Sequence, residues 1–174
     1  SDLYQVEARY GDWITTTTED SNEPSSSYNR FFLAGTFGIT SKKYMLAMSC
    51  SPRVDLAEFV LTLPEEDFYL KNSIGETFTF NIQIDKNPIA QISAEVYNET
   101  SLTLSETEDD TFFEAMEKGV EIKIEIVGEK QTRYPRFSLM GMKKAVKTTY
   151  NNCVDARDEG FVTPTTRKEY DSMV

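Results

Sequence analysis

Residues that could carry chemistry are few in this 174-residue sequence, because it contains no histidine. Without an imidazole the chain lacks Ser-His-Asp and Cys-His catalysis, histidine-ligated zinc or haem, and a histidine pH switch. It has no SxxK sequence for Ser-Lys catalysis, and neither GxxxxGK[ST] nor GxGxxG for binding a phosphate. We therefore expect a protein that is not an enzyme and that holds no cofactor.

Acidic residues are the most numerous reactive groups: 29 Asp and Glu against 18 Lys and Arg give a net charge of -11. This charge argues against binding nucleic acid or an anionic membrane. Two acidic clusters, residues 65–67 and 106–110, lack the alternating Asp/Asn pattern of a calcium loop, so we expect no metal. A carboxylate-based hydrolase remains a distant third hypothesis, because so many acids always offer pairs.

The two cysteines, Cys50 and Cys153, have no CxxC or Cys/His neighbours, which excludes zinc-finger and thioredoxin-like sites. Either they pair in an oxidising compartment, or both are small buried thiols. Their spacing alone leaves both alternatives open.

Two kinds of residue are candidates for binding a partner. Aromatic side chains beside polar loops could form a patch for a protein or a glycan. Lysines on one face of the last helix form the main basic cluster and could contact an acidic partner, although a solvated helix face is the simpler interpretation. The candidates are Tyr10, Trp13, Phe68, Tyr69, Lys143, Lys144 and Lys147.

The elements that must position these residues are mainly strands. The clearest alternation of apolar and polar residues is at 76–85, where Phe78, Phe80, Ile82 and Ile84 take every second position. Together with the other strand-like segments, this predicts a sandwich-like antiparallel β-domain of about eight strands. The expected strands are 10–18, 30–37, 43–50, 58–63, 76–85, 89–97, 101–104 and 120–127.

Two helices complete the expected fold. Thr111 and Glu114 form a capping box for a short helix at 111–118. A C-terminal helix capped by Ser138 has an apolar stripe that ends at Cys153 and packs on the sheet, where Cys50 ends a strand; this placement favours pairing of the cysteines. The stripe comprises Leu139, Met142, Val146, Thr149 or Tyr150, and Cys153. We expect one domain over 1–153 and a polar tail over 154–174.

The order of these features resembles that of a known family. It comprises a Trp-bearing first strand, a strand ending in Cys50, the strand at 78–85, a short helix followed by the strand at 120–126, and Phe137-Ser138-Leu139-Met140-Gly141 leading to Cys153. This order resembles the VasI/TagO-type proteins, which are periplasmic accessory proteins associated with type VI secretion. Similar β-rich domains occur in exported bacterial proteins of unknown role, including some that resemble invasion-associated protein B.

The resemblance implies an exported, non-catalytic domain with a bridge between Cys50 and Cys153. No apolar run is long enough to cross a membrane. Our leading hypothesis is therefore a periplasmic or extracellular module that binds another protein, in a secretion or envelope assembly. The alternative is a ligand- or glycan-binding module that uses aromatic residues in its loops.

Overall fold

The structure is a computed structural model that describes residues 3–19, 30–53, 57–106 and 111–160. The described part is mainly β, with two α-helices and a short 3-10 helix, η2 (Lys71–Ser73). The strands are β1 (Leu3–Tyr10), β2 (Trp13–Glu19), β3 (Arg30–Phe37), β4 (Met45–Cys50), β5 (Ala57–Thr62), β6 (Thr77–Ile84), β7 (Ala90–Val96), β8 (Ser101–Glu106), β9 (Glu121–Val127), β10 (Thr132–Arg133) and β11 (Arg136–Ser138). The α-helices are α1 (Thr111–Lys118) and α2 (Met142–Gly160).

All described strands belong to one antiparallel sheet of eleven strands, in the order β1-β2-β3-β4-β5-β8-β7-β6-β9-β10, with β11 on β9. The expectation of a mainly antiparallel β-domain is confirmed, but the number of about eight strands is wrong and the described strands do not form a two-sheet sandwich. The three additional strands are the first one, which pairs with β2 across a tight turn at Gly11 and Asp12, and the very short β10 and β11.

One face of this sheet carries the main core, and buried threonines stand beside its apolar residues on β2 and β3. Cross-strand partners share a face because successive side chains alternate, and the register places Leu46 with Leu61, Leu61 with Leu102, and Ile82 with Ile124. These residues belong to one buried cluster, together with Met116 of α1. Both helices therefore lie on the apolar face, and α1 is held there in part by the stacking of Phe113 on Phe59 of β5, with 4.7 Å between the ring centroids.

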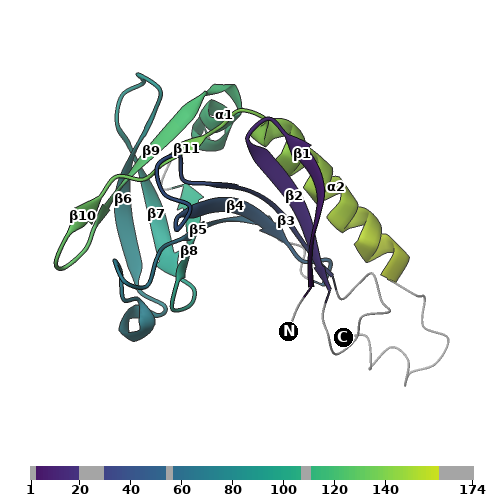
Figure 1. The fold of residues 1–174 in the computed structure, drawn as a ribbon, viewed down its shortest axis with the longest axis horizontal. Helices are drawn as coiled ribbons and strands as arrows, with labels where there is room; N and C mark the ends of the chain where they lie inside the picture. Colours follow the sequence, from purple (N-terminus) through teal and green to yellow (C-terminus); the bar gives the residue numbers. More distant parts are fainter. Residues whose placement is uncertain (1–2, 20–29, 54–56, 107–110, 161–174) are drawn as a thin grey trace.

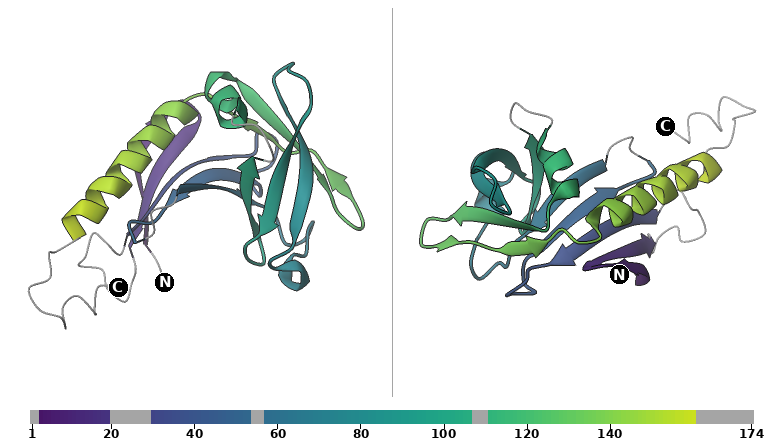
Figure 2. Two further views of the ribbon diagram at one scale, coloured as in Figure 1. Left: turned by 180° about the vertical axis from the view of Figure 1, so that it is seen from behind. Right: turned by 90° about the horizontal axis from the view of Figure 1, so that it is seen from above.

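The sheet bends into an arch, with α2 along the outer side of β1, β2 and β3 (Figure 1). The view from behind shows the same arrangement, and the view from above shows α2 running beside these strands (Figure 2). The buried stripe of α2 consists of Met142, Ala145, Thr149, Cys153 and Ala156. Of the two alternatives that the sequence left open at its centre, Thr149 is buried and Tyr150 is exposed.

Cys50 and Cys153 form a disulfide between the end of β4 and the middle of α2, with 6.2 Å between their Cα atoms. The expected pairing is confirmed. Around the bridge Phe32, Met48 and Ala156 form a second, smaller apolar cluster. The disulfide thus fixes the half of the helix that lies farthest from α1.

The C-terminal helix does not stop at Cys153. It continues to Gly160, so the boundary expected there falls inside an element. The remainder of the expected tail, 161–174, lies outside the described residues. None of the described helices is long and apolar enough to cross a membrane.

Candidate functional site

The turn between β1 and β2 interlocks with the segment that precedes α2. The Asp12 amide donates to the Met140 carbonyl (2.9 Å), and the Ser138 hydroxyl donates to the Asp12 carboxylate (2.5 Å). The Trp13 indole donates to the Ser138 carbonyl (2.7 Å). The approach needs glycine, because a Cβ on Gly141 would lie 1.9 Å from the Tyr10 carbonyl oxygen. Ser138 lies four residues before the first residue of α2, so it does not cap the helix as expected and belongs to this interlock instead.

Trp13 is central to this interlock and is 0% exposed. The expectation that it lies in a surface patch is wrong, because the indole needs both an apolar environment and a hydrogen-bond acceptor. Its ring is buried in the main core, and its N–H reaches the Ser138 carbonyl. A residue that solvent does not reach cannot contact a partner, so the glycan-binding hypothesis loses its main aromatic residue.

The other predicted binding residues divide between core and surface. Phe68 is buried in the main core, so its predicted place in a surface patch is wrong, whereas the adjacent Tyr69 is 58% exposed. Tyr10 is half-buried, and the Lys144 ammonium lies 5.3 Å from the centre of its ring. The aromatic and lysine candidates that the sequence placed at separate sites therefore meet at one cation–π contact.

The three predicted lysines, Lys143, Lys144 and Lys147, are exposed on the outer side of α2. Tyr150, one helical turn after Lys147, is also exposed. Lys144 lies over the ring of Tyr10 on β1, and all three lysines are exposed to solvent on the helix.

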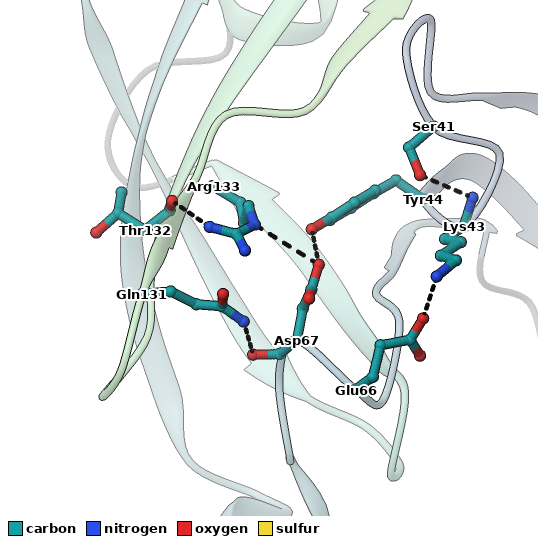
Figure 3. A network of polar contacts seen from close by, with 8 residues as sticks. All are labelled: Ser41, Lys43, Tyr44, Glu66, Asp67, Gln131, Thr132 and Arg133. Carbon is teal, nitrogen blue, oxygen red and sulfur yellow. Dashed lines mark hydrogen bonds and ion pairs between the residues drawn. The ribbon is translucent and has the colours of Figure 1, made fainter.

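A polar network on the other half of the molecule centres on Asp67 (Figure 3). Its carboxylate accepts a hydrogen bond from the Tyr44 hydroxyl (2.8 Å) and lies 3.7 Å from the Arg133 Nε. Its backbone carbonyl accepts from the Gln131 side chain (2.8 Å). At the edge, Lys43 pairs with Glu66 at 2.5 Å, and this bond lowers the pKa of Glu66. The network joins the loop after β5 to residues 43 and 44, just before β4, and to the β9–β10 hairpin. These described contacts do not pair a nucleophile with a base.

This network predicts an alkaline loss of stability. Tyr44 is almost fully buried, and its burial and the hydrogen bond to Asp67 raise the pKa of its hydroxyl above 10.0. The folded state therefore favours neutral Tyr44, and its contribution is present below pH 10 and lost as the pH rises above it. We expect urea midpoints to fall more steeply above pH 10 in the wild type than in Tyr44→Phe. Parallel curves would contradict the assignment.

The acidic clusters form no metal site in the described part of the chain. No group of three or more His, Cys, Asp or Glu residues there is arranged to hold an ion. In the first cluster Glu66 and Asp67 are engaged by Lys43, Tyr44 and Arg133. Residues 107–110 of the second cluster lie outside the described residues.

The most distinctive surface is the sheet face opposite α2, on strands β1 to β5; we call it the open face. On β2, β3 and β4 the described strand residues that share this face carry no charge, although 27% of the chain is charged. At its edges Val6 is 61% exposed and Phe31 is 45% exposed. Its central residues Thr16, Thr18, Gly35 and Ala47 are buried, and Arg9 of β1 and Glu58 of β5 lie at its margins. The face comprises Val6, Arg9, Ile14, Thr16, Thr18, Phe31, Leu33, Gly35, Phe37, Met45, Ala47, Ser49, Glu58, Val60 and Thr62.

The rest of the same sheet provides an internal comparison. On β6, β7, β8 and β9 the corresponding face is polar, and neighbouring strands are joined by side-chain hydrogen bonds from Gln91 to Asn81 (3.3 Å) and from Asn81 to Glu125 (3.3 Å). A polar face of this kind is typical of strands that face water. Along one continuous sheet, this face therefore changes from polar and charged side chains on β6 to β9 to uncharged side chains on β2 to β4.

A concavity of about 650 Å³ adjoins the open face at the end of β3. Phe37 belongs to both surfaces, and three further large apolar side chains, Ile39, Val120 and Met140, are exposed around the concavity. Asp12 and Lys42 lie among its polar lining. The concavity therefore extends the exposed apolar surface beyond the sheet.

The sequence carries a signal for the open face in two of its strands. The segments 30–37 and 43–50 were expected as strands, but both read as nearly continuous apolar runs rather than as an alternation. Strands that are apolar on both sides are typical of sheets covered on both faces. One face is covered by α2, so the second apolar set predicted a second covering element.

Comparisons with known proteins identify a fold but no family. No protein-family model matches the chain, and no curated protein matches its sequence. Among solved structures, the crystal structure of invasion-associated protein B from Bartonella henselae is similar, with a TM-score of 0.50 and 14% sequence identity. The match covers 86% of this chain and 96% of that one. At this identity the similarity shows that the two chains share an overall fold.

Proposed function

We propose that this protein is an exported, non-catalytic module that binds another protein through the open face. The observation that carries the proposal is the change along the sheet face opposite α2, from polar and charged side chains on β6 to β9 to uncharged side chains on β2 to β4. Charged residues are depleted at the centres of protein interfaces, and apolar side chains such as Phe and Met are enriched there. The open face has both properties, with Phe31, Phe37 and Met45 among its residues.

Export is supported by the disulfide. Such bridges persist in the periplasm and outside the cell, whereas the cytosol keeps thiols reduced. The order of motifs that resembles periplasmic secretion accessory proteins, and the fold shared with an invasion-associated protein, agree with this compartment. The proposed setting is a bacterial envelope or secretion assembly.

Site-specific photo-crosslinking tests the binding surface. Phe31 is replaced by p-benzoyl-phenylalanine, which keeps an aromatic ring at an exposed position. Thr79 of β6, exposed on the polar half of the same sheet, receives the same group as a control. We expect a discrete adduct in envelope fractions of the source cells from position 31 and none from position 79.

A second substitution shows whether the adduct depends on the apolar face. Val6 is highly exposed, so Val6→Lys places a charge on the face without removing a core residue. We expect the adduct from position 31 to decrease at least tenfold in this background. Equal adducts from positions 31 and 79, or none from either, would contradict binding through the open face.

A further inference from the structure

The concavity at the end of β3 lies where three segments far apart in the sequence meet. In the β3–β4 loop, the Ile39 amide donates to the Arg136 carbonyl of β11 (2.8 Å). The β1–β2 turn joins both neighbours: the Thr36 hydroxyl donates to the Asp12 carbonyl (2.7 Å), and the Asp12 amide donates to the Met140 carbonyl (2.9 Å). These bonds hold the walls of the concavity in the unbound protein, so a ligand pays little for rearranging them.

The lining of the concavity is apolar and exposed on three sides. Phe37 and Ile39 come from the end of β3 and its loop, Val120 from the residue before β9, and Met140 from the segment before α2. Each of the four is between 45% and 56% exposed. The volume of about 650 Å³ lies within the range of about 300 to 1,000 Å³ that is typical of ligand sites. Such a lining favours a large apolar side chain of a partner, because binding removes apolar surface from water.

The charges around the concavity indicate what stands beside that side chain. Among the described lining residues, Asp12, Lys42 and Glu121 are charged. Glu121 is paired with Arg136 at 3.1 Å. In the described part of the chain, Asp12 accepts a hydrogen bond from the Ser138 hydroxyl but contacts no cation, and the Lys42 ammonium has neither a hydrogen bond nor an ion pair. One anion and one cation therefore lack a counter-charge, and the complementary ligand carries one charge of each sign.

The concavity is continuous with the open face, because Phe37 belongs to both. A chain that covers the end of the open face therefore continues into the concavity. From the fixed walls, the exposed apolar lining and the two unmatched charges, we propose that the concavity binds a short segment of the partner protein in which a large apolar side chain is flanked by an acidic and a basic residue. The acidic residue pairs with Lys42 and the basic residue with Asp12. This inference rests on the proposed function and specifies the segment that the partner supplies.

Synthetic peptides test this inference on the purified, disulfide-bonded protein. The two probes are labelled peptides with blocked ends that carry leucine and phenylalanine between a lysine and a glutamate, in the two possible orders of the charges. One control has alanine in place of the apolar pair, and another has glutamine in place of both charged residues. By fluorescence anisotropy at low salt we expect one probe to bind, the alanine control to bind at least tenfold more weakly, and the glutamine control about threefold more weakly, because exposed ion pairs contribute little. A probe that binds no better than either control would overturn the inference.

Exchange of the charge at Lys42 locates the acidic end of the segment. Lys42→Glu is expected to weaken the better probe at least fivefold, because an attraction becomes a repulsion. The same variant is expected to prefer a peptide in which lysine replaces the glutamate, and this gain cannot result from misfolding. Lys130→Glu makes the same change at an exposed site on the β9–β10 hairpin and is expected to alter binding less than twofold. An unchanged preference in Lys42→Glu would contradict the assignment.

A polar substitution locates the apolar part of the segment. Ile39→Asn is expected to weaken the better probe at least tenfold, because it removes an exposed side chain from the lining of the concavity. Val127→Asn makes a comparable change at an exposed apolar residue at the far end of β9 and is expected to have less than a twofold effect. Circular dichroism and thermal melting check that both variants fold. Equal effects of the two substitutions would contradict binding in the concavity.

Photo-crosslinking separates this inference from the proposed function. With p-benzoyl-phenylalanine in place of Ile39, we expect an adduct with the same protein that position 31 captures. An adduct from position 31 without one from position 39 would overturn the inference and leave the proposed function in place. An adduct between two copies of this chain from position 39 would overturn it as well. Failure of the proposed function is distinct, since it requires that position 31 gives no specific adduct.

Discussion

Replacement of Gly141 by alanine is expected to destabilise the protein by about 3 kcal/mol or more, because two independent costs add. Gly141 has a φ of 89°, where a Cβ is strained, and that Cβ would lie 1.9 Å from the Tyr10 carbonyl oxygen. The obstructing atom belongs to the backbone, so no rotamer change can remove the clash. The β1–β2 turn and the start of α2 must separate, and the Trp13–Ser138 hydrogen bond is lost with them. Urea unfolding at neutral pH measures the loss.

Gly75 provides a matched control. Its φ is 90°, but a Cβ there would meet nothing within 4 Å. Gly75→Ala therefore has the backbone strain without the collision, and we expect it to cost only about 1 to 2 kcal/mol. If the two alanine variants lost the same stability, the close approach of Gly141 to Tyr10 would not matter energetically.

Loss of the disulfide is expected to lower the free energy of unfolding by about 4 to 5 kcal/mol, since the Cys50–Cys153 bridge closes a loop of about 100 residues in the unfolded chain. The variant to compare is Cys50→Ala with Cys153→Ala, which keeps small apolar side chains in the cluster around Phe32 and Met48. Urea midpoints of the wild type and the variant, each with and without reductant, measure the effect.

Unfolding with and without reductant distinguishes the stability due to the bridge from the stability due to the packing around it. We expect it to lower the midpoint of the wild type and to leave that of the double alanine variant unchanged. Two results would show that the bridge does not stabilise the fold. Either reductant leaves the urea midpoint of the wild type unchanged, or the double alanine variant is as stable as the oxidised wild type.

The sequence predicts those strands and helices whose pattern of apolar and capping residues lies within the element itself. The alternation Phe78-Phe80-Ile82-Ile84 identified β6, and the capping residues Thr111 and Glu114 identified α1 with the correct ends. The spacing of Cys153 from the stripe of α2 and the position of Cys50 at a strand end were enough to favour the disulfide that the structure contains.

The missing parts have different reasons. Strand β1 carries a local signal, because Tyr4, Val6, Ala8 and Tyr10 take every second position, so the alternation predicts the strand that the structure contains, with a bulge between Val6 and Ala8. The burial of Trp13 depends on an acceptor more than a hundred positions away, which no local window contains. The open face was missed for a similar reason: an apolar residue in a strand shows that a face is apolar, but not which faces the helices cover.

The hydrogen bond between Trp13 and Ser138 joins residues that are 125 positions apart. Folding rates decrease as native contacts span more of the chain, because the loop must close before the contact is gained. During synthesis the first hairpin emerges long before the segment that locks it, so the indole and the strands beside it stay exposed. The first hairpin is therefore expected to reach its final packing only after the segment around Ser138 has been synthesised.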